Sequence, residues 1–540
     1  MDNLETPLLP ADMLTAAADL VDPAVIEREM PWLTAELTKI SLGASDVWFD
    51  SRDKRFADPA WLENPHFHRL GQTYRLFELW MDRMCDTVEG PWQEQARARF
   101  LASIIKAGMA PSNYLLTNPA ALRRAVETGG LSVFNGAMNM MRDLARGGMP
   151  SAVDRSEYPV GEKLACTPGA VVYREEMFEL LQYAPSTPRV HDRPLLMVPP
   201  QVNRYYILDL APGRSVAEYA VAQGIQTFMV VWRNPRGDLG HGAWGLDDYL
   251  RAAMRAAGVV KKITRSDALN WLGLCAGGMT VTYLLSYLAA TGQSDSGAAT
   301  FIVSMAAATH PNVVGMFDTG EGRTALEMQA AAGQVIPGTA LRRLFALLRP
   351  NDLVFNYLVS GWLMGEPPTP FDVLAWNDDA SCTTAKFALE STRIAIDEFG
   401  GQDPKAARPV ILGTPIDLGL VTCDTFHVSG YTDHITPWRT CYGATQLLGG
   451  TKELTVVKSG HIQSFVNPAD SSRYDNWYGA PTVAGPDEWL NTATVEHGSW
   501  WPRWATWLTA RSGPKHPARK SLGSKDYRPI TPAPGSYVHE

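Results

Sequence analysis

Short apolar runs alternate with helix-like stretches over the second half of the chain. Six such runs follow Arg193: residues 194–200, 227–232, 268–275, 301–307, 424–430 and 453–460. Helix-like segments lie between them, among them SVAEYAVAQG and GMTVTYLLSYLAA. Short apolar strands that alternate with helices are typical of a parallel sheet covered on both faces. We therefore predict an α/β fold with a mainly parallel sheet.

The first part of the chain follows a different pattern. From about residue 67 to residue 146 the apolar residues are spaced mainly as in helices, and the breaks at GPW, APSN and ETGG predict where one helix ends and the next begins. The segment GAVVYREEMFELLQY then alternates and carries β-branched residues, which predicts a strand or hairpin that enters a new domain. We therefore predict an N-terminal, mainly helical domain over residues 1–170 and a second domain over residues 171–540.

Two segments of the second domain lie outside the alternation of strands and helices. Residues 312–405 separate the fourth and fifth strands and include the aromatic-rich stretch NDLVFNYLVSGWLMG. An insertion of this size predicts a cap or lid over the carboxyl ends of the strands. The last segment, residues 512–540, is rich in Pro, Lys and Gly, which predicts an extended or mobile tail.

Charge and cysteine usage narrow the class of protein. The 540 residues include 48 Lys and Arg and 57 Asp and Glu. The resulting net charge of −9 argues against nucleic-acid binding. The start MDNLETPLLP lacks the features of a signal peptide, and no apolar run approaches the roughly 18 residues that span a bilayer. The six cysteines are scattered without a CxxC pair, so they indicate neither a disulfide framework nor a zinc site. We expect a cytoplasmic protein without a membrane span or metal.

A candidate nucleophile stands between the third strand and its helix. The stretch GLCAGG (273–278) matches the G-x-S-x-G nucleophile elbow with Cys275 in place of serine. Gly273 and Gly277 would let backbones approach closely at the strained turn, and the helix that follows would stabilise a thiolate with its positive end. An isolated match of this kind is more often a buried structural cysteine. The strand–turn–helix context and the partners described next favour a catalytic role.

The acid and the base should follow later strands, because the order in this kind of fold is nucleophile, acid, base. Asp433 comes just after the strand that ends near Gly430, and His461 comes just after the last strand. The carboxyl ends of parallel strands meet at one edge of the sheet, where Cys275 also lies. We therefore predict a triad of Cys275, Asp433 and His461.

Other histidines and aspartates are rivals for these roles. His434 is adjacent to Asp433, and since adjacent side chains normally point apart, it is better explained as structural. His427 lies within a strand and is better explained as a core histidine. Asp417 and Asp424 precede their strand and so lie at the wrong end of the sheet. Asp433 alone could also be a turn-forming residue, and only the order of all three argues otherwise.

Backbone N–H groups near the elbow are candidates for an oxyanion hole. The N–H of Ala276 follows the nucleophile directly and is the first candidate donor. The second should come from the loop after residues 194–200. Pro199 and Pro200 have no N–H, which leaves Gln201 or Val202, and we take Gln201 as the prediction.

Longer stretches carry a resemblance to a known family. They include RDKRFADPAW, PSNYLLTNPAALRRAVETGG, GEKLACTPGAVVYREEMFELLQY, VPPQVNRYYILDLAPGRS, VVWRNP, GLCAGG, RPNDLVFNY, FDVLAWNDD, YTDHITPW, SGHIQSFVNP and GSWWPRW. In this order, over roughly residues 45–510, the chain resembles the polyhydroxyalkanoate synthases. The spellings PPQVN, GLCAGG and SGHIQS are most similar to the single-type synthases that act on medium-chain substrates.

The resemblance implies an activity and partners. It implies an α/β-hydrolase core with a cap and an N-terminal helical domain, and an acyltransferase that polymerises (R)-3-hydroxyacyl-CoA into polyester and releases CoA. The nucleophile, acid and base of the family match Cys275, Asp433 and His461. The resemblance also implies a homodimer in the cytoplasm, associated with the growing polyester chain and the granule surface, and no cofactor.

Two alternatives remain open at this point. A thioesterase or depolymerase would use the same triad to hydrolyse the acyl-enzyme, and a structural protein of the granule surface would keep the fold without the chemistry. Basic residues should bind the phosphates of CoA. Arg233, Arg236 and Arg349 are candidates, and each is equally explained as a surface or structural arginine.

Overall fold

The structure is a computed structural model that describes residues 22–50, 52–293, 296–400, 408–483 and 485–540. The contacts between residues divide the chain into two units. The first comprises Met1–Asp154, Met316–Gly322 and Arg342–Leu374, and the second comprises Arg155–Gly315, Arg323–Leu341 and Ala375–Glu540. The insertion at 312–405 thus contributes to both units. The predicted domain boundary at 170/171 and the predicted cap stay predictions.

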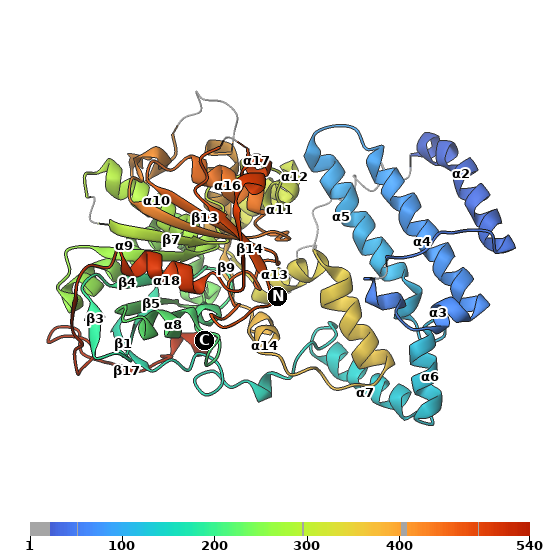
Figure 1. Ribbon diagram of the computed structural model, residues 1–540, viewed down its shortest axis with the longest axis horizontal. Coiled ribbons are helices and arrows are strands. Elements are labelled where there is room, and N and C mark those ends of the chain that lie inside the picture. Colours follow the sequence, from blue (N-terminus) through green and yellow to red (C-terminus); the bar gives the residue numbers. More distant parts are fainter. Residues whose placement is uncertain (1–21, 51, 294–295, 401–407, 484) are drawn as a thin grey trace. The chain divides into compact units, whose positions relative to one another are not determined.

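The first unit is helical over the residues described (Figure 1). Its helices are α2 (Pro23–Leu42), α3 (Ala60–Glu63), α4 (Pro65–Asp86), α5 (Trp92–Met109), α6 (Pro119–Glu127) and α7 (Leu131–Ala145). The insertion adds two π-helical segments, η7 (Asn351–Phe355) and η8 (Leu358–Leu363). Helices α4 and α5 bury Met84 and Ala98 in a shared apolar cluster.

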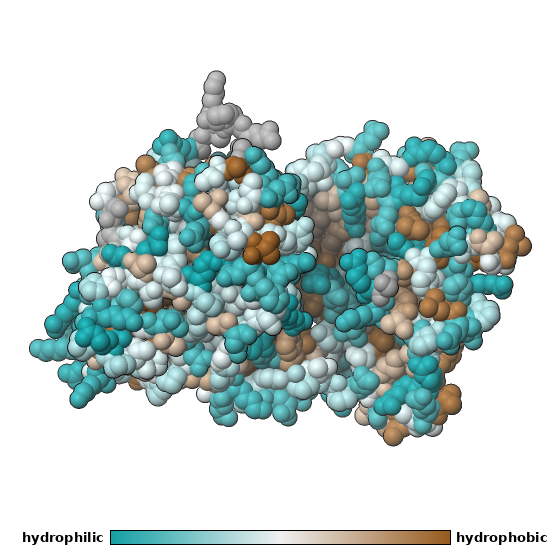
Figure 2. All heavy atoms as spheres, viewed as in Figure 1, coloured by the Kyte–Doolittle hydropathy of each residue, from teal (hydrophilic) through white to brown (hydrophobic). Residues whose placement is uncertain are grey.

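Large apolar side chains of this unit also reach solvent. Figure 2 shows brown, hydrophobic groups on its surface. Between Ile105 and Leu144 the most exposed are Val126 (81%), Leu116 (78%) and Phe134 (63%). Several large exposed apolar side chains within about 40 residues are more than the scattered single ones that a monomer surface normally carries.

The second unit is built on one large sheet (Figure 1). In spatial order its strands are β15 (Thr494–His497), β14 (Asp475–Gly479), β13 (Lys452–Val457), β12 (Asp424–Gly430), β7 (Ser296–Ile302), β6 (Leu269–Leu274), β4 (Leu195–Val198), β5 (Thr227–Trp232), β2 (Phe178–Tyr183), β1 (Gly169–Arg174) and β17 (Thr531–Pro532). The run from β13 to β5 is parallel, and the strands at both ends pair antiparallel. The predicted mainly parallel sheet is confirmed.

Helices cover both faces of this sheet because successive side chains of a strand point to opposite faces. In β7, Ala299 and Phe301 belong to the apolar cluster that includes α9 (Leu246–Thr264) and α10 (Ala276–Ala290). Between them, Thr300 accepts a hydrogen bond of 2.9 Å from the Trp504 indole of α18 (Trp501–Thr509), on the other face. Burial on both faces explains why the central strands are continuous apolar runs.

Further elements of the second unit connect and cover these strands. Its other helices are α8 (Val216–Ala222), α15 (Ala385–Arg393), α16 (Trp438–Gln446) and α17 (Pro486–Thr492). Four helices are divided between segments of the two units: α11 (Val313–Phe317), α12 (Gly320–Ala331), α13 (Gly338–Leu347) and α14 (Asp372–Asp378). Three two-stranded sheets complete the second unit: β3 (Arg189–His191) with β16 (Lys515–Pro517), β8 (Val335–Ile336) with β9 (Thr383–Thr384), and β10 (Val410–Ile411) with β11 (Thr414–Pro415).

The last segment of the chain differs from the predicted extended or mobile tail. Strand β16 pairs with β3, and β17 pairs with β1 at the edge of the large sheet. The N–H groups of Ser536 and Tyr537 donate to the buried Glu179 carboxylate at 2.9 and 3.0 Å. The segment therefore contains two short paired strands, in which Pro517 and Pro532 take part. Composition alone could not show this, because the pairing partners lie more than 320 residues earlier.

Candidate active site

Cys275 lies at a strained turn between β6 and α10. Its backbone has φ 51° and ψ −121°, a conformation that residues other than glycine rarely adopt. The Cys275 N–H donates to the Ile302 carbonyl of β7 at 2.9 Å, and the Gly278 N–H donates to the Cys275 carbonyl at 2.9 Å. The turn therefore presents the thiol at the carboxyl edge of the sheet.

The glycines around Cys275 are required by close backbone contacts. A Cβ atom on Gly273 would lie 2.5 Å from the Cα atom of Gly278. A Cβ atom on Gly277 would lie 2.3 Å from the Val198 carbonyl oxygen and 2.4 Å from that of Pro199. All three distances are far below van der Waals contact, and the backbone atoms involved cannot rotate away. The elbow thus depends on small residues two positions from the nucleophile on either side.

We expect Gly277→Ala to lower the free energy of unfolding by about 1–3 kcal/mol, because the added methyl group forces the loop after β4 to move. Denaturant unfolding measures this difference. Gly258→Ala in α9 is the matched control, since a Cβ atom there has no neighbour within 4 Å. That variant should be unchanged or more stable by up to about 1 kcal/mol. Equal unfolding midpoints for both variants would contradict the close approach at Gly277.

Asp433 follows β12 and is buried in a network of hydrogen bonds. Its Oδ1 accepts from the N–H groups of Ile435 and Thr436 at 2.8 and 3.0 Å. Its Oδ2 accepts from the Thr436 hydroxyl at 2.8 Å. Burial by itself would raise the pKa of Asp433, but the His461 ring and these donors lower it below its ordinary value. Asp433 is therefore held as a carboxylate in one orientation.

His461 follows β13 and connects Asp433 with Cys275. Its Nδ1 lies 2.6 Å from Asp433 Oδ2. Burial would lower the pKa of His461, but the charge of Asp433, its hydrogen bond to the ring and the nearby Cys275 thiol raise this pKa above its ordinary value. With Nδ1 donating to the carboxylate, Nε2 is the nitrogen left for the thiol. The structure thus brings the three side chains that the sequence predicts into one chain of contacts.

The rival histidine within β12 has a structural environment. His427 Nε2 lies 2.9 Å from the Thr425 hydroxyl, and burial together with the Lys452 charge lowers the pKa of His427 to about 3. It is a neutral core histidine. The neighbouring His434 is not the partner of Asp433 Oδ2, which bonds to His461 and Thr436 instead.

The rival aspartates also have other partners. Asp424 begins β12 and pairs with the Arg511 guanidinium at 2.8 Å. Asp417 accepts from the Gly419 N–H at 2.9 Å and pairs with Arg408 at 2.9 Å. Neither hydrogen-bonds to His461 among the contacts of the described residues. Both positions are accounted for by local capping and ion pairing.

The two candidate oxyanion donors lie beside the elbow. Ala276 is the first residue of α10, and the first N–H groups of a helix have no acceptor within it. Gln201 lies in the buried loop after β4, and its side-chain amide donates to the Thr280 hydroxyl of α10 at 2.9 Å. This bond ties the loop to the helix that carries Ala276. The oxyanion role of both N–H groups stays a prediction.

The site contains two further residues that the sequence reasoning missed. The Thr436 hydroxyl bonds to Asp433 and lies 3.3 Å from His461 Nδ1. Its spacing of three residues after an aspartate is a signal for such a turn and could have indicated it. Cys441, in α16, is buried and lies 3.6 Å from the Thr436 carbonyl oxygen. Burial and the Asp433 charge raise the pKa of Cys441 to about 12, which keeps it a thiol.

The described residues were compared with the requirements of a metal site and of a membrane-spanning helix, and they meet neither. Within the described ranges, no three His, Cys, Asp or Glu side chains gather as possible metal ligands. Among the same residues, no helix combines the length and apolar character that crossing a membrane requires.

Comparison with protein families gives two matches. Residues 52–220 match the family described as poly-beta-hydroxybutyrate polymerase (PhaC) N-terminus, and residues 231–468 match the alpha/beta hydrolase fold. The second match agrees with the observed sheet and confirms the predicted α/β-hydrolase fold.

Several curated proteins are similar to the chain over nearly its whole length. Poly(3-hydroxyalkanoate) polymerase 1 of Ectopseudomonas oleovorans is 38% identical over 98% of this chain and 95% of that protein. Poly(3-hydroxyalkanoate) polymerase 2 of the same organism is 38% identical over 94% of this chain and 90% of that protein. The poly(3-hydroxyalkanoate) polymerase subunit PhaC of Cupriavidus necator is 36% identical over 98% and 90%.

Proposed function

Because the chain belongs to the family of poly(3-hydroxyalkanoate) polymerases, ester-forming enzymes, we propose that it polymerises (R)-3-hydroxyacyl-CoA into polyester and releases CoA. We propose Cys275 as the nucleophile, His461 as the base and Asp433 as the orienting acid. One observation carries this assignment: His461 Nδ1 lies 2.6 Å from the Asp433 carboxylate, and Cys275 is close enough to the ring to contribute to its raised pKa.

In the first half of the cycle the enzyme is acylated. His461 Nε2 takes the proton of the Cys275 thiol, and the sulfur attacks the carbonyl carbon of the substrate thioester. The tetrahedral intermediate collapses as its bond to the CoA sulfur breaks. The imidazolium returns the proton to the leaving thiolate, so that free CoA departs and the acyl group remains as a thioester on Cys275.

The oxyanion of this intermediate needs donors that are already in place. The Ala276 N–H at the start of α10 and the Gln201 N–H of the neighbouring loop are the proposed donors. A single donor of this kind typically contributes about 3 kcal/mol to the barrier reduction. The hydrogen bond from the Gln201 side chain to Thr280 supports this role, because it restrains the loop against the helix.

In the second half of the cycle the ester bond forms. The 3-hydroxyl of another acyl unit loses its proton to His461, and its oxygen attacks the thioester carbonyl on Cys275. A carbon–oxygen bond forms, the carbon–sulfur bond breaks, and the imidazolium protonates the released Cys275 sulfur. Exchange of one thioester for another is nearly balanced, whereas conversion of a thioester to an ester is downhill. With a cysteine nucleophile, each elongation step is therefore favourable in free energy, and chain growth is favoured over its reversal.

The proposal includes the surroundings in which the enzyme works. As in the family that the chain resembles, we place it in the cytoplasm as a homodimer, with the growing polyester chain and the granule surface as partners. The exposed apolar side chains between Ile105 and Leu144 support contact with an apolar polymer surface.

A single assay tests the reaction. Purified protein is supplied with (R)-3-hydroxyacyl-CoAs of increasing chain length, and both CoA release and the acyl product are measured. CoA release together with polymer supports the proposal, and the rates rank the chain lengths. CoA release with only free hydroxyacid would identify a thioesterase instead. No CoA release at any chain length would contradict the proposal.

A further inference from the structure

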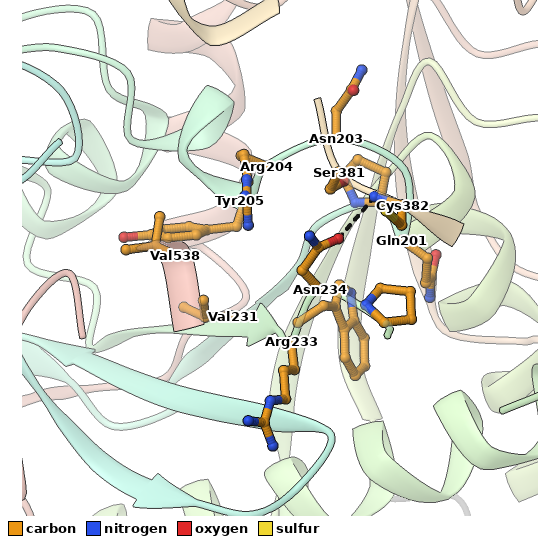
Figure 3. A pocket seen from close by; sticks show the side chains of 13 residues that line it. Gln201, Asn203, Arg204, Tyr205, Val231, Arg233, Asn234, Ser381, Cys382 and Val538 are labelled. Atoms are coloured by element: carbon orange, nitrogen blue, oxygen red, sulfur yellow. Dashed lines mark hydrogen bonds between the residues drawn. The ribbon is translucent and has the colours of Figure 1, made fainter. Parts of the chain in front are cut away.

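A small polar cavity lies at the carboxyl ends of β4 and β5 (Figure 3). Its volume is about 20 Å³, which is room for a single water molecule. Gln201 and Tyr205, from the loop after β4, lie on opposite sides of it in Figure 3. Arg233 and Asn234, directly after β5, line it as well, and the Asn234 side chain accepts from the Cys382 N–H at 2.8 Å.

Apart from Arg204 Nε, which lies 3.5 Å from Asp379 Oδ1, three buried polar atoms of residues that line the cavity have no hydrogen-bond partner among the described residues. They are Gln201 Oε1, the Tyr205 hydroxyl and the Ser381 hydroxyl, on side chains whose residues are 4%, 4% and 6% exposed. A buried polar group without a partner is uncommon because it costs free energy. Polar groups of this kind around a cavity with room for one water molecule indicate a polar site beside Arg204 and Arg233.

Three of the residues that line the cavity, Arg204, Arg233 and Asn234, also bind an anionic residue of the chain, Glu540, which does not itself line the cavity. The Glu540 carboxylate accepts from Arg233 Nε at 2.7 Å and from the second Arg233 nitrogen, Nη2, at 3.2 Å. The backbone oxygen of Glu540 accepts from Arg204 at 2.5 Å and from Asn234 at 3.4 Å. A bidentate arginine contact of this kind suits carboxylate and phosphate groups equally.

The position of this anion relative to the nucleophile follows from the strand order. Strand β4 lies between β5, which leads to Arg233, and β6, which leads to Cys275. Neighbouring strands are about 4.8 Å apart, so the two strand ends are separated by about 10 Å. The loop after β4 packs against the start of α10, where a Cβ on Gly277 would meet Pro199. The cavity is thus on the nucleophile's edge of the sheet, opposite the strands that carry Asp433 and His461.

We propose that Arg204, Arg233 and Asn234 form an anion subsite, which Glu540 fills in the absence of substrate and which a phosphate group of the CoA thioester takes when it binds. The inference rests on the proposed function for the identity of the ligand. Arg233 is then the phosphate-binding residue among the three arginines considered from the sequence. Arg236 pairs with Asp238 at 2.6 Å, and Arg349 pairs with Asp352 at 2.5 Å.

Binding to the full-length Cys275→Ala protein tests the subsite without any turnover. Calorimetry measures the dissociation constants of CoA, of pantetheine, which has no phosphate, and of inorganic pyrophosphate. Glu540→Gln should tighten CoA binding about threefold to fivefold, because it removes a competing charge. Arg233→Met should weaken CoA binding about tenfold. Arg236→Met is the matched control on the same loop and should leave CoA binding unchanged.

The phosphate-free ligand separates this role from a structural one. Pantetheine should bind alike to all variants, and pyrophosphate should follow the order seen with CoA. Equal CoA affinity in Arg233→Met and Arg236→Met, or an equal loss for pantetheine and CoA, would overturn the inference. Pyrophosphate binding that depends on Arg233, in a chain that binds no CoA, would overturn the assignment to CoA and leave a site for another phosphate. CoA release and polymer formation by the unmodified protein test the proposed function independently of these binding measurements.

Discussion

Replacing Cys275 by alanine is expected to reduce CoA release on the order of 10⁵-fold, to the background rate. The thiol is the only group at the elbow that could form the acyl-enzyme, and alanine removes it while it keeps the backbone of the turn. Cys275→Ser should also have a strongly reduced polymerisation rate. The serine would hold the acyl chain as an ester, and transfer from one ester to another lacks the favourable free energy that a thioester supplies. The measurement is CoA release from an (R)-3-hydroxyacyl-CoA under single-substrate conditions.

Cys166→Ala is the control, since Cys166 is a partly buried thiol remote in sequence from the elbow, and it should retain activity. Labelling with iodoacetamide gives a second, independent readout. Burial raises the pKa of Cys85 and Cys423 to about 11, and it raises the pKa of Cys441 to about 12, so these thiols should react slowly. Cys275 should be labelled far faster. Polymer synthesis by Cys275→Ala, or equal labelling of all thiols, would contradict the assignment.

Replacing Asp433 by asparagine should lower kcat about 10³- to 10⁴-fold with little change in the fold. The Ile435 and Thr436 N–H groups would keep the asparagine carbonyl at the Oδ1 position, since they can only donate. Its NH₂ group would then face His461 Nδ1. The ring would have to accept at Nδ1 and carry its proton on Nε2, where it could no longer take a proton from Cys275.

Two measurements check this prediction. Steady-state kinetics should show the loss in kcat, and NMR titration of the His461 ring should show a lower pKa, because the Asp433 charge that raises it is gone. Asp424→Asn is the matched control, since Asp424 pairs with Arg511 away from His461. Equal losses in both variants, or a His461 pKa that does not fall in Asp433→Asn, would contradict the orienting role of Asp433.

The sequence was sufficient for most of the sheet because its signals are local. Each of the six apolar runs overlaps a strand, and the hairpin before them forms β1 and β2. The fourth run was placed too late, since β7 spans Ser296–Ile302. The three side chains predicted as a triad could be named for the same reason: each directly follows a strand, and parallel strands end at one edge. Their catalytic roles await the substitutions described above.

Other features depended on contacts between distant parts of the chain. Thr436 was visible only as a residue near Asp433, and its position between Asp433 and His461 needed the loops after β12 and β13 to meet. Cys441 gave no signal, because a lone cysteine on a helix has no pattern. The paired strands of the last segment were missed because their partners precede them by more than 320 residues.

The amino-acid sequence by itself determined the fold class, the order of the strands along the chain and the set of chemical groups at the carboxyl edge of the sheet. These depend on hydrophobic period and on the residues next to each strand end, which are short-range properties. Only the tertiary structure decided which groups touch: that His461 bonds to Asp433, and that Arg233 holds Glu540, 307 positions away. Such contacts depend on how the strands are ordered in space, and short-range patterns do not encode that order.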